Sequence, residues 1–405
     1  MLREELVELL SPEGLTLLDS LPPYESQRDV MKLVASLRAD GHSPALVAAV
    51  LTQAKLRAKA GGPGGKFGEF AGRMLFTEAG LEQATRLAVA ARHAVRYRDA
   101  GIHRVADLGC GIGGDAMALS ALGLEVTAVD RDEVTAAIAS YNLAPFPDAT
   151  VEQGDAESFD IARVDGLWLD PARRTAGHSD TRRLTDSVDW SPSLDWVFNA
   201  ASRMPVGVKL GPGFDRELIP GSAEAQWVSF GGQVAELVLW FGSLARPGIT
   251  RAALVIGGSG AHELTAPADS DDEPVGELGA FLYEPDGAVI RARLIGDLAR
   301  SLGGRMVGDG IAYITADEAR PTPFAQCFRI IERLPYHEKD LKAELRSRGI
   351  GTLEIKKRGV DVDPAKLRTR LALKGKASAT LILTRVAGRH TALLAERLPV
   401  QKSEL

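Results

Sequence analysis

The sequence has few cysteines, since only Cys110 and Cys327 occur among 405 residues. Two cysteines this far apart do not make the disulfide framework of a small secreted protein, and neither has a partner at the spacing of a zinc site. The sequence therefore predicts no structural disulfide and no metal centre. A reducing compartment, the cytoplasm, fits this cysteine content best.

Long hydrophobic runs are also missing. The longest apolar stretches, such as LAVAA and PALVAAVL, fall well short of the ~18 residues that a membrane helix requires. The N-terminal stretch MLREELVELL mixes Arg and Glu with apolar residues, which is typical of an amphipathic helix and not of a secretory signal. We therefore expect neither a membrane span nor export.

Charge is present but unevenly distributed, behind a formal net charge of -6. From Arg320 to Leu405, 19 Lys and Arg stand against 9 Asp and Glu, a surplus of +10. Residues 1–319 then hold 29 against 45, or -16. A basic part of this kind is typical of a surface that binds a polyanion, and a merely solvated charged face is the alternative.

The length of 405 residues favours two or three domains. Apolar residues recur at helical spacing through residues 1–98, and SPALVAAVLTQAKLRAKAGG carries Ser43 as a cap, Pro44 in the first turn and Gly61 as a stop. A last helix is expected from about Glu78 to Arg98. The sequence thus predicts a helical N-terminal region over residues 1–98.

Short β-branched runs alternate with helix-length segments from His103 onward. The spacing suits parallel βαβ crossovers, and the last two runs are close enough for an antiparallel pair. We therefore expect an α/β domain over residues 99–256 with a seven-stranded, Rossmann-like sheet. Its strands are HRVADL, EVTAV, ATVEQ, VDGLWL, PVGVKL, VAELVLWF and RAALVIG.

Residues 257–276 are polar, rich in Gly and Pro, and acidic, which is the composition of a linker. Residues 277–405 are expected to form a smaller α+β domain. It opens with a hairpin-like pair around Pro-Asp-Gly in FLYEPDGAVIRA and ends with a strand, a helix and a second hairpin.

The stretch VADLGCGIGGDAMAL joins a strand to a helix through Gly109, Gly111 and Gly113. Glycines suit a tight turn whose backbone approaches a ligand closely, but the spacing alone is weak evidence because dinucleotide-binding proteins share it. Asp107 ends the first strand, where a carboxylate could receive hydrogen bonds from a cationic amino-acid moiety. A pyrophosphate would be repelled there.

Two further carboxylates follow the next strands. Asp130 ends the second strand about 20 residues on, where a carboxylate can accept both hydroxyls of a ribose. Asp155 follows the third strand and could accept from an adenine amine. A nicotinamide-dependent enzyme is a minor alternative, because no Tyr-x-x-x-Lys occurs.

Together these signals resemble the class I S-adenosylmethionine-dependent methyltransferases, whose pattern is an acidic residue before Gly-x-Gly-x-Gly and acidic residues after strands two and three. The resemblance implies S-adenosyl-L-methionine as the cofactor. It implies as cofactor-binding residues Asp107, Gly109, Gly111, Gly113, Asp130 and Asp155.

The stretch WLDPARR places Asp170 at the end of the fourth strand, facing the crevice where the methyl group would lie. Amine-methylating relatives carry Asp or Asn, then Pro-Pro and an aromatic residue, whereas Ala172 and Arg173 stand here. We predict that Asp170 positions the acceptor, that Arg173 stacks on it or pairs with phosphate, and that Arg174 contacts substrate. A structural ion pair or a degenerate, non-catalytic site are the alternatives for the two arginines.

VKLGPGF ends the fifth strand with Lys209 on the same edge of the sheet. Lys209 could contact a substrate phosphate, although a lysine that ends a strand is commonly only solvated. Both possibilities stay open at this point.

The succession of MLFTEAGLEQATR, VADLGCGIGGD, LDPARR, VKLGPG and IKKRGVDVDP resembles a bacterial methyltransferase group that ends in a THUMP-like domain. The catalytic region is similar to trimethylguanosine synthase and other RNA guanine-N2 enzymes. By this resemblance, Phe76 and Thr77 lie over the methionine end of the cofactor, and the substrate is RNA, either tRNA or rRNA.

The basic residues of the C-terminal region favour RNA independently of the resemblance. Lys356, Lys357 and Arg358 are consecutive at a strand end and are candidate phosphate contacts, and three more basic residues follow on a short helix: Lys366, Arg368 and Arg370. Two other functions remain open. One is a non-catalytic RNA-binding protein that retains a cofactor pocket, and the other is a small-molecule methyltransferase, which would leave the basic region without a role.

Overall fold

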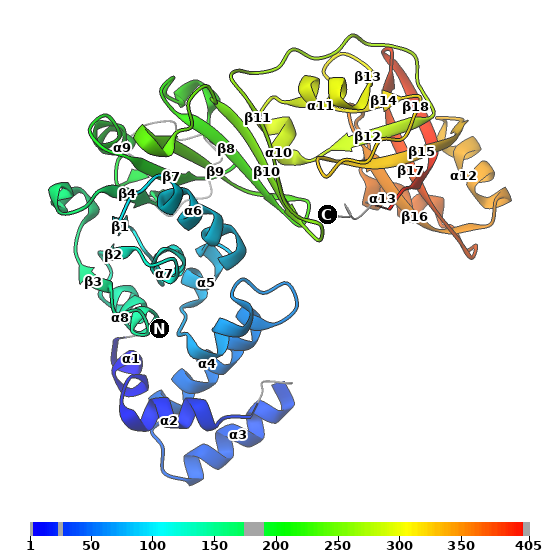
Figure 1. Cartoon of the computed structure of the whole chain (residues 1–405). Coiled ribbons are helices and arrows are strands. Elements are labelled where there is room, and N and C mark those ends of the chain that lie inside the picture. The colour runs from blue at the N-terminus through cyan, green and yellow to red at the C-terminus, as the bar shows by residue number, and fades with distance from the viewer. Residues whose placement is uncertain (1–2, 23–26, 174–189, 400–405) are drawn as a thin grey trace. The chain divides into compact units, whose positions relative to one another are not determined.

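A computed structural model describes residues 3–22, 27–173 and 190–399. The chain forms two compact units, one of Met1–Leu210 with Leu239–Ala245 and one of Gly211–Val238 with Arg246–Leu405 (Figure 1). Among the described helices, none combines the length and the apolar character that crossing a membrane would take.

Helices make up the N-terminal part of the first unit, as expected. Ser43 caps α4, since its hydroxyl accepts a hydrogen bond from the Leu46 amide at 3.0 Å, and Pro44 occupies the first turn. The helices here are α1 (Arg3–Leu9), α2 (Pro12–Ser20), α3 (Gln27–Ala39), α4 (Pro44–Gly61), the 3₁₀ helix η1 (Gly68–Arg73), α5 (Glu78–Gln83) and α6 (Leu87–Asp99).

The single helix expected from Glu78 to Arg98 is wrong, because α5 ends at Gln83 and α6 begins at Leu87. The Lys66 ammonium donates to the carbonyl oxygens of Glu82 and, at 2.7 Å, Ala84. A side chain from the preceding glycine-rich stretch thus satisfies carbonyl groups that the interrupted helix leaves open. Sequence periodicity contains no signal for such a contact.

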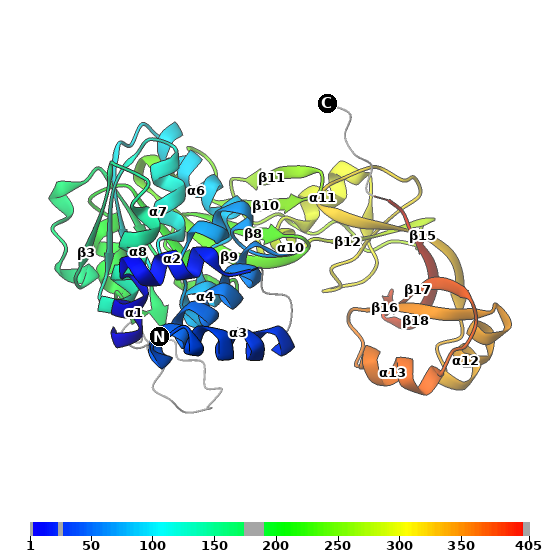
Figure 2. The same cartoon turned by 90° about the horizontal axis from the view of Figure 1, so that it is seen from below.

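A parallel sheet forms the centre of the first unit, in the order β7-β4-β1-β2-β3 (Figures 1 and 2). Its strands are β1 (Arg104–Leu108), β2 (Glu125–Asp130), β3 (Ala149–Gln153), β4 (Gly166–Leu169) and β7 (Val206–Leu210). The connections contain α7 (Gly114–Ala121), α8 (Glu133–Leu143), η2 (Ala156–Ser158), η3 (Ile161–Arg163) and α9 (Leu194–Ala201). The carboxyl ends of parallel strands meet at one edge, so the residues that end β1, β2 and β4 lie along the same edge.

The sheet continues as β11-β10-β8-β9 beside β7, which makes nine strands in the described residues and not seven. The added strands are β8 (Glu224–Phe230) and β11 (Gly260–Ala266), while β9 (Gln233–Phe241) and β10 (Arg251–Gly257) were expected; η5 (Arg216–Leu218) and η6 (Gly242–Leu244) lie in the connections. The expected antiparallel pairing of β9 with β10 is wrong, because β10 pairs parallel with β8 and antiparallel with β11.

Two physical features explain these differences. Gly231 and Gly232 have φ of 58° and 80° and form a two-residue turn between β8 and β9, which makes these two strands neighbours. Strand β11 lies at the edge of the sheet, where polar side chains such as His262 and Glu263 are tolerated. A polar edge strand has the composition of a linker, so the predicted linker over 257–276 is wrong in its first half.

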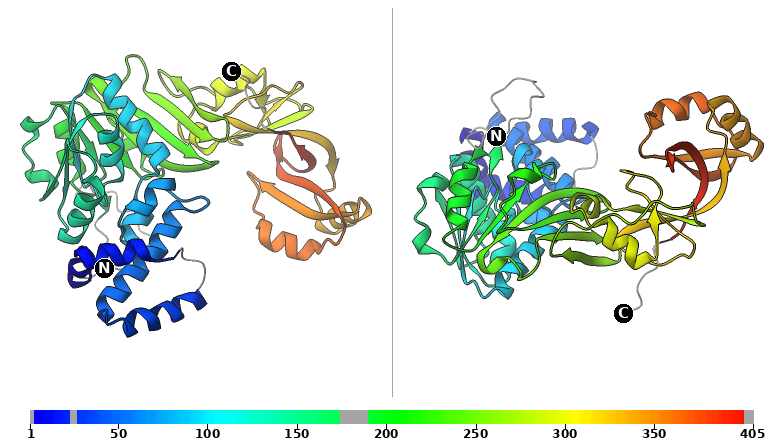
Figure 3. Two further views of the ribbon diagram at one scale, coloured as in Figure 1. Left: turned by 60° about the horizontal axis from the view of Figure 1, so that its bottom comes forward. Right: turned by 90° about the horizontal axis from the view of Figure 1, so that it is seen from above.

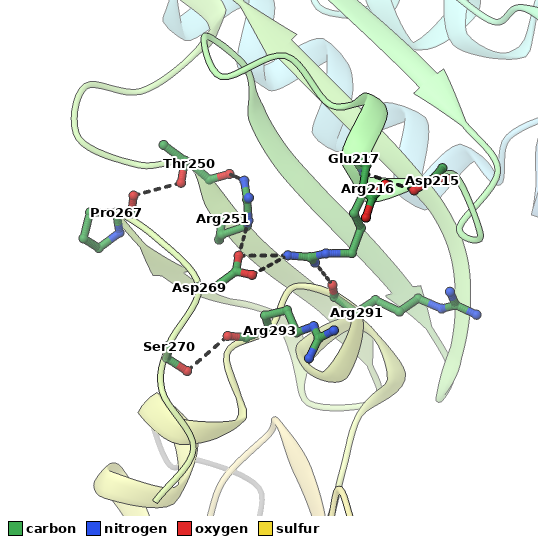
Figure 4. A network of polar contacts seen from close by, with 10 residues as sticks. All are labelled: Asp215, Arg216, Glu217, Thr250, Arg251, Pro267, Asp269, Ser270, Arg291 and Arg293. Carbon is green, nitrogen blue, oxygen red and sulfur yellow. Dashed lines mark hydrogen bonds and ion pairs between the residues drawn. The ribbon is translucent and has the colours of Figure 1, made fainter. Parts of the chain in front are cut away.

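Ion pairs connect the segments of the second unit. The Asp269 carboxylate accepts two hydrogen bonds of 2.8 Å from Arg216 and one of 2.6 Å from Arg251, and Arg216 also donates to the carbonyl oxygen of Arg291 (Figure 4). A second, more buried network joins Arg246 to Glu224 and Glu263, each at 2.5 Å. These pairs tie the loop after β7 and the strands β8, β10 and β11 to one another.

A second sheet, ordered β13-β14-β12-β15-β18-β17-β16, forms the C-terminal part of this unit (Figure 1). The expected hairpin around Pro-Asp-Gly is wrong, because Asp286 caps α10 by accepting from the Ala288 amide at 2.8 Å. The elements are β12 (Phe281–Pro285), α10 (Gly287–Arg291), α11 (Ile295–Leu302), β13 (Arg305–Met306), β14 (Ile314–Ala316), β15 (Ala325–Leu334), α12 (Glu338–Ser347), β16 (Ile350–Lys357), α13 (Pro364–Leu371), β17 (Ala377–Val386) and β18 (Arg389–Arg397).

Helices α12 and α13 cover one face of this sheet (Figure 3). Leu341 and Leu345 of α12 and Leu367 and Leu371 of α13 pack against apolar residues of β16, β17 and β18. The predicted strand, helix and hairpin toward the C-terminus are therefore present, and the α/β class with a smaller α+β part is confirmed.

Candidate functional site

The loop after β1 brings the backbone close to the end of β4. Gly109, Gly111 and Gly113 all have positive φ, of 90°, 56° and 83°, which L residues with a side chain rarely adopt. A Cβ on Gly109 would lie 3.4 Å from the Asp170 carbonyl oxygen. Gly109 therefore lies against the backbone of Asp170, and the positive φ of all three glycines gives the tight turn that the sequence pattern predicted.

Asp130, at the end of β2, orders the same loop. Its carboxylate accepts from the Gly111 amide at 3.0 Å and from the Asp132 amide at 2.9 Å. Burial raises the pKa of the Asp130 carboxyl, although these two amides counteract the shift. The residue is placed where the sequence expected a carboxylate that accepts ribose hydroxyls.

Asp107 is a buried carboxyl at the end of β1, only 1% exposed. Its Oδ2 atom has no hydrogen-bond partner among the described residues. Burial raises the pKa of Asp107 well above its usual value, and the nearby carboxylates of Asp115 and Asp170 raise it further, while Lys209 opposes them. An orphaned acceptor of this kind fits a ligand that brings a cationic donor.

Asp155 lies just beyond β3, which pairs with β2. Its side chain is exposed and accepts from the Glu157 amide at 2.8 Å, so it caps the short helix η2. The three predicted carboxylates thus follow three adjacent strands, and Asp155 is the most solvated of them.

Helix α5, which precedes β1 in the chain, packs against the loop after β1 that contains Gly109, Gly111 and Gly113, here called the glycine loop. Thr77 caps this helix by accepting from the Gly80 amide at 2.9 Å. A Cβ on Gly80 would come within 2.5 Å of Ile112 Cγ2, so α5 and the glycine loop are in direct contact. The expectation that Phe76 and Thr77 lie over the methionine end of the cofactor stays a prediction.

Two buried amide side chains that the sequence analysis missed fix this arrangement. Asn142 of α8 bonds to both backbone groups of Leu75, at 2.8 and 3.0 Å, and donates to the carbonyl oxygen of Ile112 at 2.9 Å. Gln53 of α4 bonds to both backbone groups of Phe76, at 2.8 and 2.9 Å. A polar residue inside an apolar stretch such as VAAVLTQAKL was the only available signal.

Asp170 ends β4, and its carboxylate pairs with Lys209 at the end of β7. The Nζ atom of Lys209 lies 2.5 Å from Oδ2 of Asp170 and donates to the Thr85 hydroxyl at 3.0 Å. Lys209 is only 9% exposed. The expected contact of Lys209 with a substrate phosphate is therefore not supported, because its ammonium already binds a carboxylate inside the first unit.

A further buried pair joins His93 of α6 to Asp115 of α7. His93 Nδ1 and Asp115 Oδ1 are 3.0 Å apart and buried, and Trp168 packs on His93 with ring centroids 4.4 Å apart. Burial acts to raise the pKa of Asp115, but the hydrogen bond and charge of His93, with help from Lys209 and Thr85, hold it below its usual value. Asp115 thus remains a carboxylate within the protein.

Of the two arginines predicted to contact substrate, Arg173 and Arg174, the structure describes only the backbone of Arg173. Strand β5 (Ala172–Arg173) pairs antiparallel with β6 (Trp190–Ser191), which places the Arg173 backbone opposite Trp190. The Arg173 side chain and the whole of Arg174 lie outside the described residues.

The three consecutive basic residues at the end of β16, in the second unit, do not form one exposed row. Lys356 pairs with Glu284 at 2.9 Å, and the Arg358 guanidinium lies 5.3 Å from the ring centroid of Tyr313. Lys357 is exposed. Alternation along a strand turns neighbouring side chains to opposite faces, so Lys357 is the most exposed of the three, while Lys356 and Arg358 are half-buried.

Comparison with known proteins identifies the family. Residues 325–397 match the family described as THUMP domain-like, and residues 3–60 match a domain of unknown function (DUF8688). A curated S-adenosylmethionine-dependent methyltransferase of Mycobacterium tuberculosis, in strains CDC 1551 / Oshkosh and ATCC 25618 / H37Rv, is 32% identical over 331 residues, 80% of this chain and 89% of the relative.

One solved structure supports the fold over nearly the whole chain. A presumed methyltransferase from Porphyromonas gingivalis W83 is 20% identical and has a TM-score of 0.70, with 92% of this chain and 99% of that chain covered. An RNA methyltransferase from Salinibacter ruber in complex with S-adenosyl-L-homocysteine covers 38% of this chain and 88% of its own at 17% identity, with a TM-score of only 0.25, too low to support an argument.

The glycine loop, the carboxylates that follow β1 and β2, and the identity with the mycobacterial relative agree with one another. The chain belongs to the S-adenosylmethionine-dependent methyltransferases, and S-adenosyl-L-methionine is its cofactor.

Proposed function

We propose that this methyltransferase acts on a nucleotide in RNA, either tRNA or rRNA. The observation that carries the proposal is the THUMP domain-like region on the same chain, since THUMP-type domains are associated with RNA. This region, residues 325–397, holds 17 Lys and Arg against 8 Asp and Glu, a surplus of +9. A cationic surface of this kind suits a phosphate backbone.

The residues proposed to bind the cofactor lie along one edge of the first sheet. Asp107 Oδ2, which has no hydrogen-bond partner in the part of the chain that the structure describes, fits the ammonium group of the methionine moiety, and Asp130 fits the ribose hydroxyls. Thr77 lies on the α5 side of the glycine loop. The full proposed set is Asp107, Gly109, Gly111, Gly113, Asp130, Asp155 and Thr77.

Asp170 is the proposed acceptor-binding residue, because it ends β4 against the glycine loop. The cofactor supplies a methyl group already activated on a positively charged sulfur. The lone pair of the acceptor nitrogen forms the new C–N bond, the electrons of the broken C–S bond stay on sulfur, and the N–H proton leaves to Asp170 or water. The protein therefore has to orient the acceptor more than activate it.

Arg173, Arg174 and Lys357 remain proposed substrate contacts. A planar guanidinium can stack on a base or pair with phosphate, which would compensate for the aromatic residue that is missing at position 173. Lys356 and Arg358 are weaker candidates, since Glu284 and Tyr313 already engage them.

The test is methyl transfer from trideuteromethyl-labelled cofactor to total bacterial RNA, followed by nucleoside mass spectrometry. A nucleoside heavier by one labelled methyl group is the expected result, and it names the base. Label found only in small molecules of a cell extract would replace RNA by a small-molecule substrate. RNA that is retained by the protein but never labelled would indicate a non-catalytic RNA-binding protein.

A further inference from the structure

Lys209 links two segments of the first unit that are far apart in sequence. Its ammonium lies 2.5 Å from Asp170 Oδ2 at the end of β4 and donates at 3.0 Å to the hydroxyl of Thr85. Thr85 lies in the break between α5 and α6, which the sequence analysis expected to be continuous helix. The break therefore delivers a hydroxyl to the lysine that binds the proposed acceptor residue.

The Thr85 hydroxyl also has a second partner, the carboxylate of Asp115. Thr85, which is 6% exposed, hydrogen-bonds to Asp115, and Asp115 pairs with His93 at 3.0 Å. A buried polar chain thus runs from His93 through Asp115, Thr85 and Lys209 to Asp170. Each member has a defined partner, which fixes the position of the lysine within a well-packed interior.

Charge balance around Asp170 explains what a held lysine can do. Asp107 and Asp115 are close enough to influence each other, and Asp170 and Lys209 act on Asp107 as well. An unheld Asp170 carboxylate would move among rotamers and would be attracted to the positive sulfur of the cofactor, which stabilises the ground state and not the transition state. A fixed cation prevents both.

We infer that Lys209 is a positioning residue for methyl transfer: it holds the Asp170 carboxylate at the end of β4 and is itself held by Thr85. The inference rests on the proposed role of Asp170 and adds a residue that acts through it. It also replaces the substrate contact that the sequence had suggested for Lys209.

A double-mutant cycle in the full chain tests this, with wild type, Asp170→Asn, Lys209→Met and the double variant. The first readout needs no acceptor. Calorimetry gives the affinity ratio of sinefungin to S-adenosylhomocysteine, because sinefungin carries an amine on the carbon that replaces the methylated sulfur. Its ammonium therefore senses charge close to the methyl position.

Lys209→Met should raise this ratio about fivefold or more, since Asp170 loses its neutralising partner. In the Asp170→Asn background the same change should alter the ratio less than twofold. The second readout is tritium transfer to total bacterial RNA. There, Lys209→Met should lower kcat roughly 10-fold to 100-fold with Asp170 present and less than twofold without it, while the cofactor KM stays within about threefold.

Further variants guard against misfolding. Lys209→Arg keeps the cation and should restore most of the rate, and Thr85→Val should show a smaller effect of the same sign. Lys55→Met serves as the matched control, because Lys55 is an exposed lysine of the same unit, paired with Glu78 at 3.6 Å. It should change neither readout.

The outcomes distinguish the role of Asp170 from the role of Lys209. If Asp170→Asn changes neither the ratio nor the rate, the proposed role of Asp170 fails. If Asp170→Asn acts but Lys209→Met has equal effects in both backgrounds, Lys209 does not act through Asp170 and this inference is overturned. If wild type labels no RNA, the proposed substrate fails and the calorimetric cycle alone decides the role of Lys209.

Discussion

At the scale of single residues, Asp107 places a functional group where it destabilises the free protein. Its carboxyl is 1% exposed, and one of its oxygens has no hydrogen-bond partner among the residues described. A buried unsatisfied acceptor typically costs about 1–3 kcal/mol. We expect this cost to be recovered when the cofactor binds, because the methionine ammonium supplies both a donor and a positive charge.

Asp107→Asn should therefore stabilise the free protein and weaken cofactor binding. The pKa of Asp107 is raised above its ordinary 3.8 by burial, so the folded wild type binds more protons than the unfolded chain between 3.8 and the raised pKa. The contribution of Asp107 to the free energy of unfolding is therefore present at low pH, and it is lost as pH rises from 3.8 through the raised pKa.

In the Asp107→Asn variant, the free energy of unfolding should not show this decrease with pH. Urea unfolding between pH 4 and 8, with calorimetry of S-adenosylmethionine binding, is the measurement. If the free energy of unfolding depends on pH in the same way in both proteins, the pKa of Asp107 is not raised in the folded state.

At the scale of elements, an aromatic cluster packs against β7 and leaves no room for a side chain at Gly207. Trp168 and Trp240 lie with ring centroids 5.8 Å apart, and the Tyr97 ring meets both. A Cβ on Gly207 would lie 2.7 Å from Tyr97 Oη, 2.8 Å from Trp240 and 2.9 Å from Trp168. Only glycine fits this position of β7.

Gly207→Ala should accordingly destabilise the chain by ~1–3 kcal/mol or more, the usual cost of overpacking. Gly211→Ala is the control, because nothing lies within 4 Å of a Cβ there. Equal melting temperatures for both variants would mean that the cluster has room that the structure does not show.

The break between α5 and α6 gives a pH prediction of opposite sign. Burial, with Lys209, Arg86 and Lys59 as neighbouring cations and Glu82 opposing them, lowers the pKa of Lys66 from 10.5 to about 8. The folded chain then binds fewer protons than the unfolded chain between about pH 8 and 10.5, so this residue makes stability rise with pH there.

Lys66→Met should remove this rise, although it also removes the hydrogen bonds to the carbonyls of Glu82 and Ala84. Chemical denaturation at pH 7.5, 9 and 10 checks it. A rise of the same size in the methionine variant would contradict the assignment to Lys66.

Sequence patterns predicted the elements whose signal is local. The glycine loop, Asp130 at the end of β2 and the helix after Ser43 follow from residue type and spacing, and the structure has each of them. The break at Thr85 was not predictable, because the carbonyl groups that it leaves open are satisfied by Lys66, a side chain from another segment. The partner of Lys209 was not predictable either, since only the folded sheet brings β4 and β7 together.

At the scale of the whole molecule, the charge asymmetry predicts a salt-dependent interaction with RNA. Exposed lysines of the THUMP domain-like region lie on or next to α13 and β17: Lys366, Lys374 and Lys376. Each phosphate that a lysine neutralises releases condensed counterions, so affinity falls as salt rises.

Reversing these three lysines to Glu in the full chain should weaken RNA binding and flatten its salt dependence by roughly one unit of slope per lost contact. Reversal of three exposed arginines of the first unit, Arg92, Arg98 and Arg203, controls for net charge and should have the smaller effect. Filter binding at several salt concentrations measures both. Equal losses in the two sets would mean that overall charge, and not this surface, governs binding.

The central claim, a methyl transfer to RNA at Asp170, is tested most directly by comparing wild type with Asp170→Ala in one tritium-transfer assay on total bacterial RNA. Asp170 is expected to contact the acceptor and not to hold the cofactor. The variant should therefore bind S-adenosylmethionine within about a factor of ten of wild type while transferring methyl groups ~10²-fold more slowly. Equal incorporation by both proteins would contradict the account.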